Sequence, residues 1–244
     1  YFHRVVAADS AQGPAIADFL ISAKSPKKAF VISDDQEYSV GLADAVNQAF
    51  KAKGVEVGRD QFSKDASDYS SSVTKIKTFS PDVIFYGGYY SQAGRLLKQV
   101  RDDGITALFA TGDGSLDNGL ITGAGAPAAE GAVVGCPCAV PGPDAAQGAL
   151  KKFYADYTAK FKEEPAVYST EGYDAATAFI NAIKAGNTTS DAINNYLATE
   201  SFQGVAKPVK FQSDGDVASS DIFIHQVKNG RLELLGNSKV AKLG

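Results

Sequence analysis

Short apolar runs alternate with amphipathic helical segments along the first 136 residues of this chain. In the helical segments, apolar residues recur at the spacing of one helix face, as Leu42, Val46 and Phe50 do. The apolar runs between them are Ala29 to Ser33, Val55 to Val57, Asp82 to Tyr86, Leu108 to Thr111 and Gly131 to Cys136. Strands separated by helices of about a dozen residues form right-handed βαβ units with parallel strands. The sequence therefore predicts the α/β class, with an open, mainly parallel sheet flanked by helices.

The pattern changes after Pro141-Gly142-Pro143-Asp144, which is typical of a break between elements. Helices are predicted near Gln147 to Phe161 and Ser169 to Ala185, each with an apolar face. Strand and turn signals return at Lys207 to Phe211, Ile222 to Val227 and the hairpin pair Asn229-Gly230.

Charge and hydropathy exclude several classes of partner. The net charge of −4 argues against nucleic acid and anionic membranes. No apolar run approaches the roughly 18 residues that span a bilayer. The chain contains no methionine, so we expect that a segment has been removed from its front.

Two tyrosine-bearing loops follow predicted strands. The loop at Ser33 to Leu42 carries Tyr38, and the loop at Tyr86 to Tyr90 carries Tyr89. In open α/β sheets, ligands bind just outside the carboxyl ends of the strands. Both loops offer polar groups and aromatic faces without a positive charge, which suits a small zwitterion better than a nucleotide phosphate. Asp113 follows a third strand and is either a turn residue or a carboxylate placed to pair with a ligand cation.

Catalytic and cofactor signatures are missing from the sequence. Of the two histidines, His3 is terminal and His225 lies on an alternating strand that favours a structural role. There is no Gly-x-Ser-x-Gly elbow and no phosphate loop. The segment from Asp113 begins like a calcium loop, but Asn118 and Ala124 replace the required glycine and glutamate. We predict no enzyme activity, no metal site and no cofactor.

The cysteine pair Cys136 and Cys138 leaves three alternatives open. On a strand, residues i and i+2 lie about 6.6 Å apart, near the upper limit for a disulfide. The pair forms a strained disulfide, two free thiols or half of a metal site, and the sequence shows no second pair to complete such a site.

Several motifs follow one another over almost the full length of the chain. They are Asp9-Ser10-Ala11-Gln12-Gly13-Pro14, Asp35-Gln36-Glu37-Tyr38, Phe85-Tyr86-Gly87-Gly88-Tyr89, Gly112-Asp113-Gly114, Ala129-Glu130-Gly131, Gly172-Tyr173-Asp174-Ala175-Ala176, Lys210-Phe211 and Asp214-Gly215-Asp216. With these motifs the chain resembles the branched-chain amino-acid (Leu/Ile/Val) binding proteins, the type I periplasmic substrate-binding family that serves ABC importers. Each motif alone is weak, whereas their order and spacing together are specific.

The resemblance implies two α/β lobes joined by crossover strands, with a ligand between them. It implies that residues 1–138 and 220–244 form a complete second lobe. Residues 139–219 would form the C-terminal part of the first lobe, whose leading strands a missing N-terminal fragment would supply. Without those strands, the apolar helix faces in this part would pair with a second copy or with a separate piece of chain.

The resemblance also implies a ligand site. Tyr38 and Tyr89 match tyrosines that wall the cleft, and Asp113 matches a carboxylate, usually glutamate, that pairs with the ligand ammonium. Tyr168 matches an aromatic position near the side-chain pocket. The implied function is amino-acid uptake through an ABC transporter permease, with branched-chain amino acids as ligands and an extracytoplasmic location, in the periplasm or on a lipid anchor. The alternative is a ligand-sensing receptor domain of the same fold.

Overall fold

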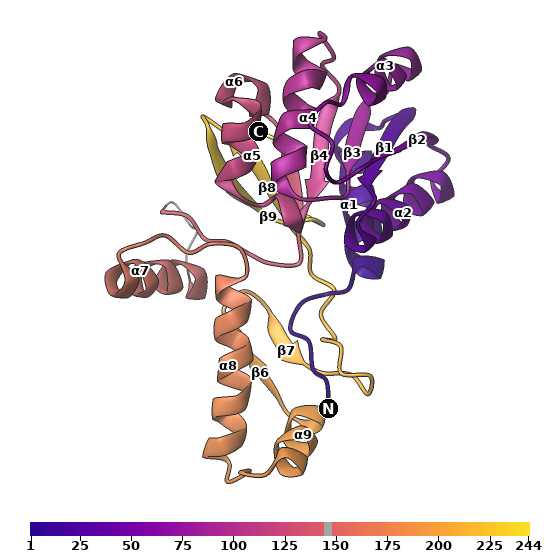
Figure 1. The fold of residues 1–244 in the computed structure, drawn as a ribbon. Helices are drawn as coiled ribbons and strands as arrows, with labels where there is room; N and C mark the ends of the chain where they lie inside the picture. The colour runs from indigo at the N-terminus through magenta and orange to yellow at the C-terminus, as the bar shows by residue number, and fades with distance from the viewer. Residues whose placement is uncertain (144–147) are drawn as a thin grey trace. The chain divides into compact units, whose positions relative to one another are not determined.

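The computed structural model describes residues 1–143 and 148–244, which divide into two compact units (Figure 1). The large unit comprises Asp9–Cys136 and Ile222–Gly244, and the small unit comprises Tyr1–Ala8 and Pro137–Asp221. The divisions after Cys136 and Asp221 lie within two residues of positions 138 and 220, whereas the division after Ala8 groups residues 1–8 with the small unit. The assignment of these units to two lobes stays a prediction. Asp144 of the expected break and Gln147 of the expected helix lie outside the described residues.

One seven-stranded sheet forms the centre of the large unit, in the order β2-β1-β3-β4-β5-β8-β9. The strands are β1 (Lys28–Asp34), β2 (Glu56–Phe62), β3 (Val83–Tyr86), β4 (Leu108–Gly112), β5 (Val133–Cys136), β8 (Phe223–Lys228) and β9 (Arg231–Asn237). The first five strands pair in parallel, and β8 and β9 add an antiparallel hairpin. Asn229 and Gly230 turn that hairpin with φ of 52° and 73°, which confirms the predicted turn. The predicted α/β class with a mainly parallel sheet is also confirmed.

Helices cover the sheet of the large unit (Figure 1). They are α1 (Asp9–Lys24), α2 (Glu37–Ala52), α3 (Ser70–Phe79), α4 (Tyr90–Asp102), the short 3₁₀ helix η1 (Asp113–Ser115), α5 (Asn118–Ala124) and α6 (Ala126–Ala129). Helix α1 packs against α2, and α4 packs against α5 and α6. The central strands read as continuous apolar runs because they are buried on both faces; every residue of β3 and β5 is buried.

The strand order reverses between β1 and β3. From β1 the chain crosses to β2 on one side, and it then returns to β3 on the other side of β1. Right-handed crossovers in opposite directions place their helices on opposite faces, so the loops after β1 and β3 diverge. A crevice opens at such a reversal, and it is the usual ligand position in open α/β sheets.

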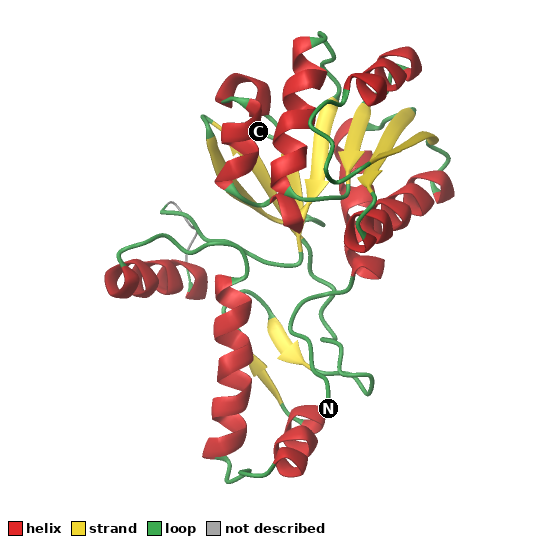
Figure 2. Ribbon diagram, in the orientation of Figure 1, coloured by secondary structure: helices red, strands yellow, loops and turns green. Residues whose placement is uncertain are grey.

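Helices dominate the small unit (Figure 2). They are α7 (Ala149–Phe161), α8 (Ser169–Lys184) and α9 (Ser190–Thr199), accompanied by the antiparallel pair β6 (Ser201–Gln203) and β7 (Pro208–Lys210). Its apolar core contains Ala178, Leu197, Val209 and Phe211. The N-terminal residues join this unit through a bidentate ion pair between Arg4 and Asp216, with nitrogen–oxygen distances of 2.7 Å.

Both cysteines are disulfide-bonded, which settles the alternatives that the sequence left open. They are the only two cysteines of the chain, so the bond joins Cys136 at the end of β5 to Cys138. Among residues 1–143 and 148–244, no helix is both long and apolar enough to cross a membrane. Within the same residues, no cluster of three or more histidine, cysteine or acidic side chains offers a metal site.

Candidate functional site

Tyr38 and Tyr89 face each other at the reversal point of the sheet. Tyr38 lies in the first turn of α2, after β1, and Tyr89 lies directly before α4, after β3. Their ring centroids are 5.1 Å apart. Tyr89 is 41% exposed and Tyr38 is half-buried, so both rings remain near the surface at the strand ends.

Asp113 lies beside these rings, at the end of β4 and the start of η1. The Tyr38 hydroxyl donates to Asp113 Oδ1 at 2.9 Å and accepts from the Gly114 amide at 3.1 Å. A Cβ at residue 114 would approach Tyr38 Cε1 to 2.9 Å and Tyr89 Cδ1 to 3.1 Å. The absence of a side chain at Gly114 thus allows the loop to pass close under both rings.

A buried hydrogen bond joins the ends of the two strands that precede these loops. The Tyr86 hydroxyl, at the end of β3, donates to Asp34 Oδ2 at the end of β1 over 2.7 Å. Asp34 also accepts from the Gln36 amide at 2.8 Å. Burial, with the Asp34 carboxylate, holds the pKa of Tyr86 far above its ordinary value, so the hydroxyl stays protonated as a donor. The ends of β1 and β3, and with them Tyr38 and Tyr89, are therefore held in register.

Gln12 is a member of this cluster that the site prediction missed. It lies on α1 and is 1% exposed, and its Nε2 donates to Asp113 Oδ1 at 2.6 Å and to the Gly135 carbonyl at 2.9 Å. The motif Asp9 to Pro14 was a signal for it, although the motif alone did not indicate what the glutamine binds. Gln12, Tyr38, Tyr89 and Asp113 together present one carboxylate, one amide, two hydroxyls and two aromatic faces, and none of them is cationic. Such a set can accept an ammonium group against the carboxylate.

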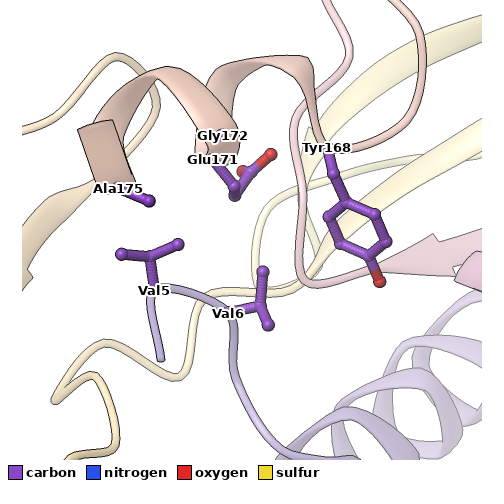
Figure 3. Close-up of a pocket in the computed structure, with 6 residues that line it drawn as sticks. All are labelled: Val5, Val6, Tyr168, Glu171, Gly172 and Ala175. Atoms are coloured by element: carbon purple, nitrogen blue, oxygen red, sulfur yellow. The ribbon is translucent and has the colours of Figure 1, made fainter. Parts of the chain in front are cut away.

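Tyr168 lies in the small unit, so the structure describes it apart from the other three predicted residues. It precedes α8 with φ of 64°, in the left-handed region. Tyr168, Val5, Val6, Glu171, Gly172 and Ala175 line a mostly apolar pocket of about 240 Å³. Figure 3 shows the two valines opposite the first turns of α8, with the tyrosine ring to one side.

A buried charge network next to this pocket had no sequence signal, because its members are far apart in the chain. Lys207 Nζ donates to the Pro137 carbonyl at 2.6 Å and lies 3.8 Å from Glu171 Oε1. Thr170 Oγ1 donates to Glu171 Oε2 at 2.8 Å. Burial raises the pKa of Glu171 and lowers that of Lys207, and each charge opposes the shift of the other. The network binds the segment after β5 to the first turn of α8.

His225, the strand histidine, lies within the sheet of the large unit. It is on β8 and is 1% exposed. Burial lowers the pKa of His225 to about 3, so the imidazole is neutral at physiological pH.

Comparison with known proteins identifies the family. Residues 1–231 match the family described as "Periplasmic binding protein". An amino acid binding protein of Pseudomonas aeruginosa is 30% identical over 237 residues, which cover 91% of this chain and 59% of that protein. The leucine-specific-binding protein of Salmonella typhimurium is 26% identical over 227 residues, covering 93% of this chain and 60% of the relative.

A solved structure agrees with these relatives. The leucine binding protein of Thermotoga maritima superimposes with a TM-score of 0.86 at 29% identity, over 96% of this chain and 67% of that one. The chain spans about three fifths of the length of the curated relatives that it matches. With 231 of its 244 residues within the family match, the chain belongs to the periplasmic binding proteins.

Proposed function

We propose that this chain is part of a substrate-binding protein that binds an amino acid, with branched-chain aliphatic amino acids as its ligands, and delivers it to an ABC transporter permease. The observation that carries the proposal is the Asp113 carboxylate, which Tyr38 and Gln12 hold at the end of β4, beside the reversal point of the sheet. A ligand ammonium can pair with this carboxylate while Tyr38 and Tyr89 wall the cleft. The relatives that bind amino acids or leucine support the ligand class. No catalytic step is part of the proposal.

The Asp113→Asn substitution in the full-length protein tests this assignment. It keeps the shape of the side chain and removes its charge, so leucine binding should weaken by about 2–3 kcal/mol, the scale of a charge-assisted hydrogen bond. Isothermal titration calorimetry measures the change.

The matched control for this substitution is Asp117→Asn. Asp117 caps α5 through its side chain, and an asparagine oxygen can replace that bond. The control should bind leucine as the wild type does. Equal affinities in all three proteins would return Asp113 to the role of a turn residue.

We infer that the large unit corresponds to the complete second lobe of a family member and the small unit to the C-terminal part of the first lobe. The coverage of about three fifths of each relative supports this reading. So do the apolar side chains of the small unit that are 47–58% exposed, namely Phe161, Tyr173, Phe179, Ile180 and Ile183. A second copy or a separate piece of chain covers them. A monodisperse monomer by light scattering, with tight leucine binding and no copurifying fragment, would contradict this inference.

The location of the protein belongs to the same proposal. We place it outside the cytoplasm, exported by a signal sequence and either free in the periplasm or lipid-anchored at the cell surface. The family description and the Cys136–Cys138 disulfide support an oxidising compartment. Fractionation of the native host, followed by mass spectrometry of the mature N-terminus, distinguishes a free chain from an anchored one; recovery in the cytoplasm would contradict export.

A further inference from the structure

We propose that Gln12 is a positioning residue of the ligand site, which holds the Asp113 carboxylate in the orientation that receives the ligand ammonium. The inference rests on the proposed function, and it adds to that function a residue that does not itself touch the ligand. Its basis is the position of one amide nitrogen between two acceptors.

The amide nitrogen of Gln12 donates to two acceptors. Gln12 Nε2 lies 2.6 Å from Asp113 Oδ1 and 2.9 Å from the Gly135 carbonyl. A carboxylate and a carbonyl are both acceptors, so the amide atom that faces them has to be the nitrogen, which carries two hydrogens. One hydrogen anchors the side chain to β5, and the other holds the carboxylate.

Gln12 links the site to α1 and β5 of the large unit. It lies on a sixteen-residue helix and is 1% exposed, so its side chain is fixed by packing. Asp113, in contrast, opens a three-residue 3₁₀ helix that follows β4. The bond from Gln12 therefore transmits the position of α1 and β5 to a carboxylate on a short loop, whose precise orientation decides how well it pairs with a cation.

Tyr38 holds the same carboxylate oxygen through a second hydrogen bond. Its hydroxyl donates to Asp113 Oδ1 at 2.9 Å, so two donors from two helices fix this oxygen. Gly112 makes the approach possible, because a Cβ at that residue would come within 3.1 Å of the Tyr38 hydroxyl and 2.3 Å of Leu42 Cδ2. Residues of α1 and α2 and the end of β4 together determine the position of the carboxylate.

A double-mutant cycle in the full-length protein tests the inference. Gln12→Met keeps the length and apolar stem of the side chain and removes both donors. We expect leucine affinity to fall about tenfold in the wild-type background and less than twofold in an Asp113→Ala background, because the residue acts only through that carboxylate. Equal fold-losses in the two backgrounds would show a general structural effect and overturn the proposal.

Gln226→Met is the matched control. Gln226 is also a buried glutamine of the large unit, at 4% exposed, and its Nε2 donates to the Gly131 carbonyl at 3.4 Å. This variant should keep wild-type leucine affinity even if its melting temperature falls as far as that of Gln12→Met. A loss of affinity equal to that of Gln12→Met would contradict the assignment.

A ligand-free crystal structure of Gln12→Met separates this proposal from the proposed function. If the wild type binds no amino acid, the proposed function fails. The orientation of the Asp113 side chain can still be determined from the ligand-free crystal structures of the wild type and the variant. In this variant we expect the Asp113 carboxylate to move and to lose the hydrogen bond that it accepts from the Tyr38 hydroxyl in the wild type. An unmoved Asp113, with its bond to Tyr38 intact, would overturn the positioning role on its own.

Discussion

The two units differ in how far the apolar faces of their helices are buried. In the large unit, α4 buries Ala93, Leu96, Leu97 and Val100 completely. In the small unit, α7 has no buried residue. Its neighbour in sequence, α8, exposes Tyr173, Phe179, Ile180 and Ile183 to about half of their surface. Burial of apolar surface stabilises a fold by roughly 25 cal/mol per Å². The exposed face of α8 therefore lacks a stabilisation that the apolar face of α4 has.

The interiors of the two units differ as well. The central strands of the large unit form an apolar core, with Phe85 and Phe109 fully buried. The small unit buries Glu171, Asp174 and Lys207 around the first turns of α8. Burying charge is costly unless it is paired. The small unit, with these three charged side chains, therefore depends more on specific polar contacts than the large unit, which buries Asp34 within a mainly apolar core. The large unit thus has the features of a self-sufficient domain, whereas the small unit leaves apolar helix faces exposed.

The largest effect is expected from breaking the buried charge pair of the small unit. Lys207→Met leaves Glu171 buried without its cation, so the free energy of unfolding of the small unit should fall by about 3–5 kcal/mol. Urea denaturation followed by circular dichroism measures it. The double variant with Glu171→Gln should lose less, because it removes both charges; a single variant as stable as the wild type would show that packing alone holds this unit.

Two isoleucines on helices give a matched test of packing in the two units. Ile76 of α3 is 0% exposed and Ile183 of α8 is 53% exposed. Ile76→Ala should lower the free energy of unfolding by about 2–5 kcal/mol, since it leaves a cavity. Ile183→Ala should stay within about 0.5 kcal/mol in the chain alone. Similar losses by urea denaturation would mean that the α8 face is already covered, and would remove the contrast between the units.

A smaller effect concerns the pH dependence of the small unit. Burial raises the pKa of Asp174 to about 6, and the nearby Glu171 adds to the shift, whereas the Val205 amide and Lys207 oppose it. The folded state thus binds this proton more tightly than the unfolded state, whose carboxyl has the ordinary pKa of 3.8. The stability from Asp174 is fully present below pH 3.8 and is lost as pH rises through about 6.

Asp174→Asn should therefore remove a fall in the free energy of unfolding between about pH 4 and pH 6. Urea denaturation at a series of pH values gives the slope for the wild type and the variant. Asp156→Asn, which changes an exposed carboxylate of α7, is the control and should keep the wild-type slope. Identical slopes for all three proteins would show that Asp174 is not desolvated.

The sequence predicted the large unit better than the small one, for a physical reason. Strands buried on both faces, such as Val83–Tyr86, give continuous apolar runs that are visible in the sequence. For the edge strand Glu56–Phe62, the sequence predicted a strand only at Val55 to Val57, because the polar and at least partly exposed residues Arg59, Asp60 and Gln61 interrupt its apolar pattern. The short β6 strand was missed, since three residues carry too little pattern.

The positions of the strand ends account for the part of the site that the sequence predicted. Tyr38, Tyr89 and Asp113 each follow a strand, and a parallel sheet brings such positions to one edge, so the sequence predicted their proximity. Gln12 comes from a helix that precedes the first strand, and no local pattern shows that its amide reaches Asp113. The pairing of Lys207 with Glu171 is similarly a consequence of tertiary structure alone.

Titration calorimetry of the full-length protein with leucine and with 4-methylpentanoate, the analogue that lacks the ammonium group, tests the central claim most directly. If Asp113 receives an ammonium beside the reversal point of the sheet, leucine binds with one site per chain and the analogue binds at least tenfold more weakly. Equal affinity for the two compounds, or no heat with any common amino acid from the folded protein, would contradict the account.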